Sequence, residues 1–313
     1  MQTTGSPLSH SDSERRRQDA ALVRRATHVA VAVAGVLIVA KLAAWLASDS
    51  VAMLSSLIDS SLDAGASVLN LLAVRHAMMP PDREHRFGHG KAEALAGLGQ
   101  SAFISGSALF LLIEAIGRLA RPQPPAHGEL AVAVMLGSIM LTAGLVLFQH
   151  YVKRRTNSLA VGADAMHYKG DLLANVAVIL TIVLSNRFGW HVADPLFALA
   201  IGGYILFSAY GILRAALDQL MDRELPEEMR RRIKQIALRH HEVRDLHDLR
   251  SRMSGRDVFI QLHLEMTPSL TLLRAHEVSD EVEREIAEAF PGAEVIIHQD
   301  PEGVEPPPVL LQA

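Results

Sequence analysis

Six long apolar segments constrain this chain more than any other feature of its sequence. They cover approximately residues 22–47, 51–79, 91–119, 130–152, 157–184 and 194–217. Each has about 20 residues or more, the length that a helix needs to cross a hydrocarbon core of ~30 Å. Lysine in such a segment keeps its stem in lipid and its ammonium at the interface, which we expect for Lys41. The sequence therefore predicts an α-helical polytopic membrane protein with six transmembrane helices.

The chain after residue 218 has a different composition and predicts a soluble domain. Charged residues are scarce from about residue 26 to 218 and dense afterwards. Apolar residues then recur at helical spacing, followed by two predicted strands, of which the second alternates apolar and polar residues. A second helical pattern and a short last strand follow. The order α-β-β-α-β is typical of a small α+β ferredoxin-like domain with helices on one face of its sheet. We expect a disordered tail over 1–20, a six-helix domain over 21–218, a ferredoxin-like domain over 219–302 and a flexible tail over 303–313.

The distribution of lysine and arginine predicts the orientation in the membrane. One side of the bundle receives the arginines before the first helix, those around 75–91, and Lys153-Arg154-Arg155. The other side receives only Arg118, Arg121 and Arg187 near its helix ends. Basic loops stay in the cytosol, so both termini are predicted to be cytosolic, in a cell membrane. The polar, arginine-rich first 20 residues show no signal peptide, and the net charge of -4 gives no reason to expect a nucleic acid partner.

Two pairs of ionisable residues lie inside the apolar segments. Asp59 and Asp63 are four residues apart in the second segment, and His167 and Asp171 are four apart in the fifth, so each pair shares one helix face. The first pair lies roughly 12–18 Å and the second roughly 15–21 Å along its helix, counted from opposite membrane faces. Both pairs therefore reach the middle of a ~30 Å core. Asp164 shares the stripe of His167 but is shallower, and we place it in the cytosolic mouth.

The two pairs together predict a site for a divalent metal. Ionisable groups at membrane depth are costly and mark a pathway or site. Three carboxylates and one imidazole form a four-ligand set, and a chain without cysteine offers only nitrogen and oxygen ligands. The alternative is that each pair faces a cytosolic vestibule or is neutralised by protonation. Two matched pairs favour the metal site, and the chain reads as a membrane protein that handles metal ions.

Two further groups of candidate ligands lie in polar parts of the chain. In the loop after the second segment, the candidates are Asp82, His85 and His89, and glycines flank His89, which lets the backbone turn tightly round an ion. After residue 218, the candidates lie on different predicted elements: His247, His263, His276, His298 and Asp300. Single histidines are usually unconnected surface residues and polar loops are usually solvated. Spacing alone leaves convergence of either group open.

Five motifs distributed along the chain resemble one known family. They are Leu57-Ile-Asp-Ser-Ser-Leu-Asp63, His85-Arg-Phe-Gly-His-Gly-Lys-Ala-Glu93, His167-Tyr-Lys-Gly-Asp171, Leu220-Met-Asp-Arg-Glu-Leu-Pro226 and Val295-Ile-Ile-His-Gln-Asp-Pro301. From about residue 22 to 301 the chain resembles the cation diffusion facilitators, and within them the bacterial zinc/iron efflux branch. The resemblance implies a homodimer in the lipid bilayer that exports divalent metal in exchange for protons, without a prosthetic group.

The resemblance also implies roles for particular residues. The transport site would be Asp59, Asp63, His167 and Asp171. The loop site would be Asp82, His85 and His89. A binuclear cytosolic site that regulates transport would be His247, His263, His276, His298 and Asp300. Lys91 and Asp222 would form a charge pair that holds the membrane and soluble parts of the dimer together.

The ligand chemistry agrees with a metal/proton exchanger. One imidazole with three carboxylates suits Zn²⁺ or Cd²⁺, while Fe²⁺, Co²⁺ and Mn²⁺ stay possible. Metal binding requires deprotonated ligands, so protons and metal compete, and His167 is the expected proton carrier. Two alternatives stay open. A membrane-anchored metal sensor explains the C-terminal histidines but not the intramembrane pairs. An intramembrane metallohydrolase would need a general base such as the Glu of His-Glu-x-x-His, which this sequence lacks.

Overall fold

The structure is a computed structural model that describes residues 10–48, 51–120, 129–188 and 192–303. Internal contacts divide the chain into two compact units. One unit is Gln18–Leu217, and the other is built on the residues from Asp218 onward. Two parts of the predicted tails lie outside the described residues: 1–9 of the N-terminal tail and 304–313 of the C-terminal tail.

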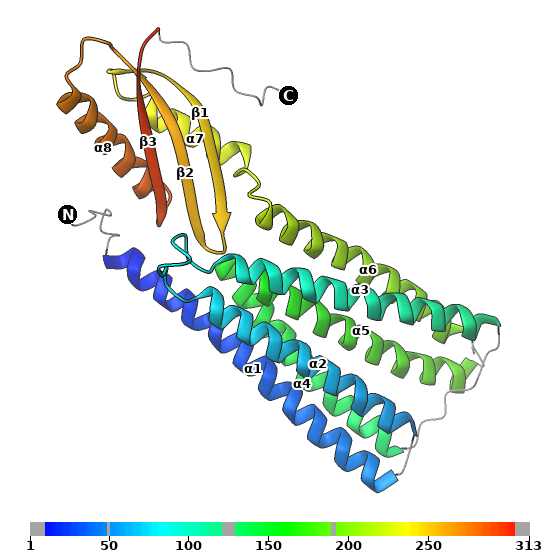
Figure 1. Ribbon diagram of the computed structural model, residues 1–313. Coiled ribbons are helices and arrows are strands. Elements are labelled where there is room, and N and C mark those ends of the chain that lie inside the picture. The colour runs from blue at the N-terminus through cyan, green and yellow to red at the C-terminus, as the bar shows by residue number, and fades with distance from the viewer. Residues whose placement is uncertain (1–9, 49–50, 121–128, 189–191, 304–313) are drawn as a thin grey trace. The chain divides into compact units, whose positions relative to one another are not determined.

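The first unit is helical. Its helices are α1 (His10–Ser48), α2 (Val51–Ala77), α3 (Lys91–Ala120), α4 (Glu129–Thr156), α5 (Leu159–Phe188) and α6 (Ala193–Leu220), and they run alongside one another (Figure 1). All except α5 are long and apolar enough to cross a membrane. Large apolar side chains point outward, with Leu46 71%, Phe110 72% and Phe207 76% exposed. Such an apolar exterior suits lipid, and the predicted six-helix architecture is confirmed.

The start of α1 differs from the prediction. The sequence predicts a disordered tail up to residue 20, but this prediction is wrong for residues 10–19, because α1 already begins at His10. The segment from Glu14 onward consists mainly of Glu, Arg, Gln and Ala, which favour helix. Asp19 is buried, and its carboxylate accepts a hydrogen bond of 3.1 Å from Arg155 Nε on α4. Asp19 of α1 is thus packed against the bundle.

Helix α5 lies among the other helices of the unit and brings its polar face into the interior. It packs against α2, α3 and α4. Tyr168 of α5 is 2% exposed and lies in a cluster with Leu37 of α1 and Leu145 of α4. Elsewhere α3 and α6 approach closely at Gly202, where an added Cβ would lie 2.8 Å from Leu112 Cδ2. The polar residues of α5 are therefore held inside a tightly packed bundle.

The C-terminal unit combines two helices with a three-stranded sheet. Its elements are α7 (Glu227–Ala237), β1 (Val243–Ser254), β2 (Asp257–Met266), α8 (Leu272–Ala289) and β3 (Ala293–Pro301). The strand order is β1-β2-β3, with β1 antiparallel and β3 parallel to β2. Gly255, with φ of 61°, turns the chain between β1 and β2. The predicted element order is confirmed.

The two faces of β2 have opposite roles. Ile260, Leu262 and Leu264 are almost fully buried, and they share one core with the apolar residues of α7 and α8. Both helices cover this face of the sheet (Figure 1). The alternate residues, Gln261, His263 and Glu265, are on the opposite face and are more exposed. The sheet therefore presents an uncovered polar face on which metal ligands can gather.

Candidate metal centres

The first group of candidate ligands lies between α2 and α5. Asp63 of α2 and His167 and Asp171 of α5 each offer one ligand atom, and these atoms all lie within 4.8 Å of one another. His167 Nε2 is 2.9 Å from Asp63 Oδ1 and 3.6 Å from Asp171 Oδ2. The imidazole is only 5% exposed and contacts the ring of Phe103 on α3 at a centroid distance of 5.6 Å. We call this group the central site; a single divalent cation could be bound by all three side chains.

Asp59 is placed differently from its predicted partners. It lies one turn before Asp63 on α2 but is exposed, and the group of mutually close ligand atoms contains Asp63, His167 and Asp171 without it. The role of Asp59 as a fourth ligand stays a prediction.

Lys41 faces the central site instead of the membrane interface. Its Nζ donates hydrogen bonds to Ser60 Oγ at 2.6 Å and to the Ser56 carbonyl at 3.3 Å, both on α2. A cavity of about 20 Å³ is lined by Lys41, Asp63 and Asp171 together with Ser60, Ser138, Thr142 and Asn175. The snorkelling expected for Lys41 is wrong, because two oxygens on α2 satisfy its ammonium inside the protein. A space of this size holds about one water molecule.

Asp164 is sealed and does not line a mouth. It is 1% exposed, and its carboxylate accepts hydrogen bonds from Gln149 Nε2 at 2.6 Å and from Ser67 Oγ at 3.3 Å. The Ser67 and Tyr168 hydroxyls are 2.8 Å apart and extend this network. Partners from α2 and α4 thus enclose the carboxylate of α5. Its predicted place in the cytosolic mouth is wrong, because the sequence shows its depth but not the polar partners around it.

The loop between α2 and α3 brings its three predicted ligands together. Asp82, His85 and His89 offer ligand atoms within 4.8 Å of one another, and we call them the loop site. Asp82 Oδ1 lies 3.4 Å from His85 Nδ1, and Asp82 Oδ2 lies 3.3 Å from His89 Nε2. A hydrogen bond from the backbone N–H of His85 lowers the pKa of Asp82, with a second from that of Glu84. The loop backbone therefore keeps this carboxylate in the ionised form that a metal requires.

On the uncovered face of the sheet, three strands supply a third group, which we call the sheet site. His247 of β1, His263 of β2 and Asp300 of β3 have ligand atoms within 4.8 Å of one another. Asp300 Oδ2 is 2.8 Å from His263 Nδ1 and 3.3 Å from His247 Nε2. Strand register produces this convergence, because His247 pairs with His263, and β3 runs parallel beside β2. Burial raises the pKa of Asp300, but the hydrogen bond from His263 and the nearby histidine charges outweigh it and lower that pKa overall.

The other two predicted sheet ligands are more peripheral. The His298 ring stacks at 4.6 Å from that of His263, and its Nε2 is 3.3 Å from Asp300 Oδ1, but its side chain is 64% exposed. His276 on α8 is also 64% exposed, and its Nδ1 lies 3.6 Å from Asp280 of its own helix. Neither belongs to the close group, and their roles as ligands stay predictions.

Two acidic residues beside the sheet site were not predicted as ligands. Glu265 Oε1 lies 3.0 Å from His247 Nδ1, and Asp248 Oδ2 lies 3.9 Å from His263 Nε2. Alternation along β2 places Glu265 on the same face as His263, so the sequence contained that signal. Asp248 reaches the site because the pairing of β1 with β2 shifts between His247 and Arg250, where Asp248 has φ of 47°. An irregularity of this kind has no clear sequence signature.

The predicted pairing of Lys91 with Asp222 joins residues of different units. Within the C-terminal unit, Asp222 Oδ1 is 3.3 Å from Arg252 Nη1. The charge pair with Lys91 stays a prediction.

Comparison with known proteins identifies the family of this chain. Residues 27–221 match the family model of the cation efflux transmembrane domain, and residues 225–302 match that of the cation efflux protein cytoplasmic domain. The chain is 49% identical over 285 residues to the cation-efflux pump FieF of Klebsiella pneumoniae, with 91% of this chain and 95% of the relative covered. It is 50% identical to FieF of Escherichia coli over the same length and coverage.

A solved structure titled "Mode of Action of a Putative Zinc Transporter CzrB" covers 25% of this chain and 99% of its own, at 36% identity and a TM-score of 0.25. The two family models together cover almost all of the described chain, and the matching relatives are pumps, which argues against a metallohydrolase. This chain therefore belongs to the cation efflux family, the cation diffusion facilitators, and is a multi-pass membrane transporter.

Proposed function

We propose that this protein exports divalent metal cations, with Zn²⁺ as its principal substrate, in exchange for protons. The observation that carries the proposal is the central site, where Asp63, His167 and Asp171 meet inside a bundle of membrane-spanning helices. Ionisable side chains are expensive within a membrane and ordinarily mark a site or pathway. The relationship to cation-efflux pumps supports export as the direction.

The donor set supports zinc. Two carboxylates and one imidazole from the protein, with Asp59 or water completing the shell, suit a small tetrahedral cation of intermediate softness. Fe²⁺, Cd²⁺, Co²⁺ and Mn²⁺ have the same charge and can bind oxygen and nitrogen. We therefore expect the site to bind these cations with different affinities and not to exclude any of them completely.

Coupling to protons follows from competition for the same atoms. The lone pair of His167 Nε2 and the oxygens of Asp63 and Asp171 can hold either protons or a metal. The 2.9 Å contact between His167 and Asp63 is a hydrogen bond when a proton occupies it, so the site has a favourable arrangement for both occupants. If the central site faces each side of the membrane in turn, loading with protons on one side releases metal there, and the cycle is antiport.

The remaining features fit a regulated exporter. From the basic residues at the helix ends, we propose that both termini lie in the cytosol and that the protein resides in the cell membrane. The sheet site then lies in the cytosol, where we propose that it binds metal when cytosolic metal is abundant and favours pairing of two C-terminal units in a homodimer. A ligand shifts such an equilibrium only by binding one state more tightly, so metal must bind the paired state better.

Transport by purified protein in liposomes tests the proposal. Asp63→Ala removes one of the three close ligands and should abolish zinc flux in a protein that still folds. Ser61→Ala is the matched control, because Ser61 lies on the same helix and is exposed, and its hydroxyl donates to the Leu57 carbonyl of its own helix at 2.8 Å. Near-normal zinc flux in Asp63→Ala would refute the assignment of the central site.

A further inference from the structure

One ring nitrogen of His89 in the loop site has no hydrogen-bond partner among the predicted ligands of that site. Its side chain is only 3% exposed, and Nε2 faces Asp82 Oδ2 at 3.3 Å. The other nitrogen, Nδ1, is buried without a hydrogen-bond partner in the described part of the chain. A buried, unpaired ring nitrogen is costly, and histidines that bind metal ordinarily have a partner for each nitrogen. A further polar group beside this ring would supply the missing partner.

His76 is that group. It lies in the last turn of α2, and its ring centroid is 4.7 Å from that of His89, with an angle of 71° between the ring planes. The ring of His85 lies 4.6 Å from His89 as well. His76 and His85 thus both contact His89, although only His85 belongs to the close group with Asp82. The structure shows no hydrogen bond or ion pair for the His76 side chain, within the residues it describes.

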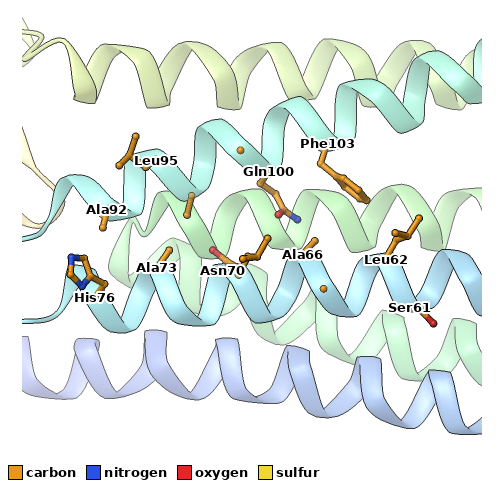
Figure 2. A pocket seen from close by; sticks show the side chains of 14 residues that line it. Ser61, Leu62, Ala66, Asn70, Ala73, His76, Ala92, Leu95, Gln100 and Phe103 are labelled. Carbon is orange, nitrogen blue, oxygen red and sulfur yellow. The ribbon is translucent and has the colours of Figure 1, made fainter.

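The surroundings leave His76 free to turn. Its side chain is exposed, and it stands at one end of a groove of about 640 Å³ between α2 and α3, opposite Ala92 (Figure 2). Alanine and glycine make up much of the groove lining near it, including Ala73 and Ala96. Small neighbours leave an imidazole room to change rotamer, so a ring nitrogen of His76 can approach the loop site without displacing the backbone.

We propose that His76 is the fourth ligand of a divalent-metal site formed with Asp82, His85 and His89. This proposal rests on the proposed metal transport only for the identity of the cation. Three imidazoles and one carboxylate provide a shell richer in nitrogen than the central site, which favours Zn²⁺ over Mn²⁺. The ligands span the end of α2, the connecting loop and the residue two before α3 begins at Lys91. A bound metal would tie these three parts together.

Zinc affinity of the full-length protein tests the proposal. In an Asp63→Ala, His263→Ala, Asp300→Ala background, which disables the central and sheet sites, the remaining zinc reports the loop site. Competition with a chromogenic chelator should show binding at least about tenfold weaker after His76→Gln, as loss of a ligand requires. His150→Gln is the matched control, because His150 is an exposed histidine at the end of α4, and it should bind as the background does.

A second variant separates direct coordination from an indirect effect. The natural chain has no cysteine, so His76→Cys in the same background introduces a single thiolate. If residue 76 coordinates the metal, Co²⁺ should produce a thiolate-to-metal charge-transfer absorption. His150→Cys should bind Co²⁺ without that absorption.

Three outcomes would overturn the proposal: unchanged zinc affinity after His76→Gln, Co²⁺ bound to His76→Cys without charge transfer, or no zinc bound to the background protein. In each case the proposed transport function would stand, because the Asp63→Ala flux assay tests the central site independently.

Discussion

The hydrogen bond between Gln149 and Asp164 provides a quantitative test of how the helical unit holds α5. Gln149 on α4 is 1% exposed, and its Nε2 donates to Asp164 Oδ2 at 2.6 Å. Gln149→Leu keeps the approximate volume of the side chain and leaves one carboxylate oxygen unpaired. Loss of a buried hydrogen bond to a charged group costs about 1.5–3 kcal/mol. The longer bond from Ser67, at 3.3 Å, should contribute less, about 1 kcal/mol.

The expected shift in melting temperature is large enough to measure. For a unit of this size, 1 kcal/mol corresponds to about 2–4 °C, so Gln149→Leu should lower Tm by about 3–12 °C. Thermal unfolding of the detergent-purified protein, followed by size-exclusion chromatography, gives the values. Gln100→Leu is the matched control, because Gln100 is also buried but its Nε2 has no hydrogen-bond partner among the described residues. Its Tm should not fall.

A double-mutant cycle isolates the pair. In an Asp164→Asn background the side-chain amide of Gln149 no longer donates to a charged group. The loss of unfolding free energy caused by Gln149→Leu should therefore be smaller in that background than in the natural protein, by at least about 1 kcal/mol. An equal effect in both backgrounds would show that Gln149 contributes by packing alone and would refute the reasoning.

Three further predictions concern the metal sites and the C-terminal unit. His167→Asp replaces the imidazole of the central site by oxygen and should weaken discrimination against Mn²⁺ in metal-resolved flux assays, whereas unchanged selectivity would contradict the ligand role. His263→Ala should weaken zinc binding at the sheet site and slow transport without abolishing it, and normal transport would contradict regulation by that site. Two hydrogen bonds from Arg274, of 2.8 and 2.7 Å, lower the pKa of Glu242 below its ordinary 4.5. The stability from this pair is therefore present above pH 4.5 and lost as the pH falls through the lowered pKa. Denaturation at a series of pH values should show the natural protein more stable than Arg274→Ala at neutral pH and the difference vanishing in acid.

The sequence predicts the elements well, because strong local patterns govern them. Long apolar runs define the helices of the first unit, Pro80-Pro81 follows the end of α2, and alternation along β2 separates its buried and polar faces. The main error, the start of α1, arises because a polar segment is compatible with either a disordered tail or an exposed helix end. Composition alone does not decide between them.

The candidate sites are predicted less completely, because side chains meet through tertiary contacts. Spacing pairs Asp59 with Asp63 on one helix and His167 with Asp171 on another, each pair one helix turn apart. It does not show that Lys41 turns toward Ser60, that Gln149 encloses Asp164, or that Asp248 reaches the sheet site through a strand irregularity. His76 belongs to an apolar helix in the sequence, and only folding places it beside His89.

Zinc flux under imposed pH gradients shows whether metal and protons compete at one intramembrane site. Purified protein in liposomes should move Zn²⁺ in the direction opposite to the proton gradient. Reversal of the gradient should reverse the net flux, and Asp63→Ala should show neither. Zinc flux of the same direction and rate under both gradients would contradict the account.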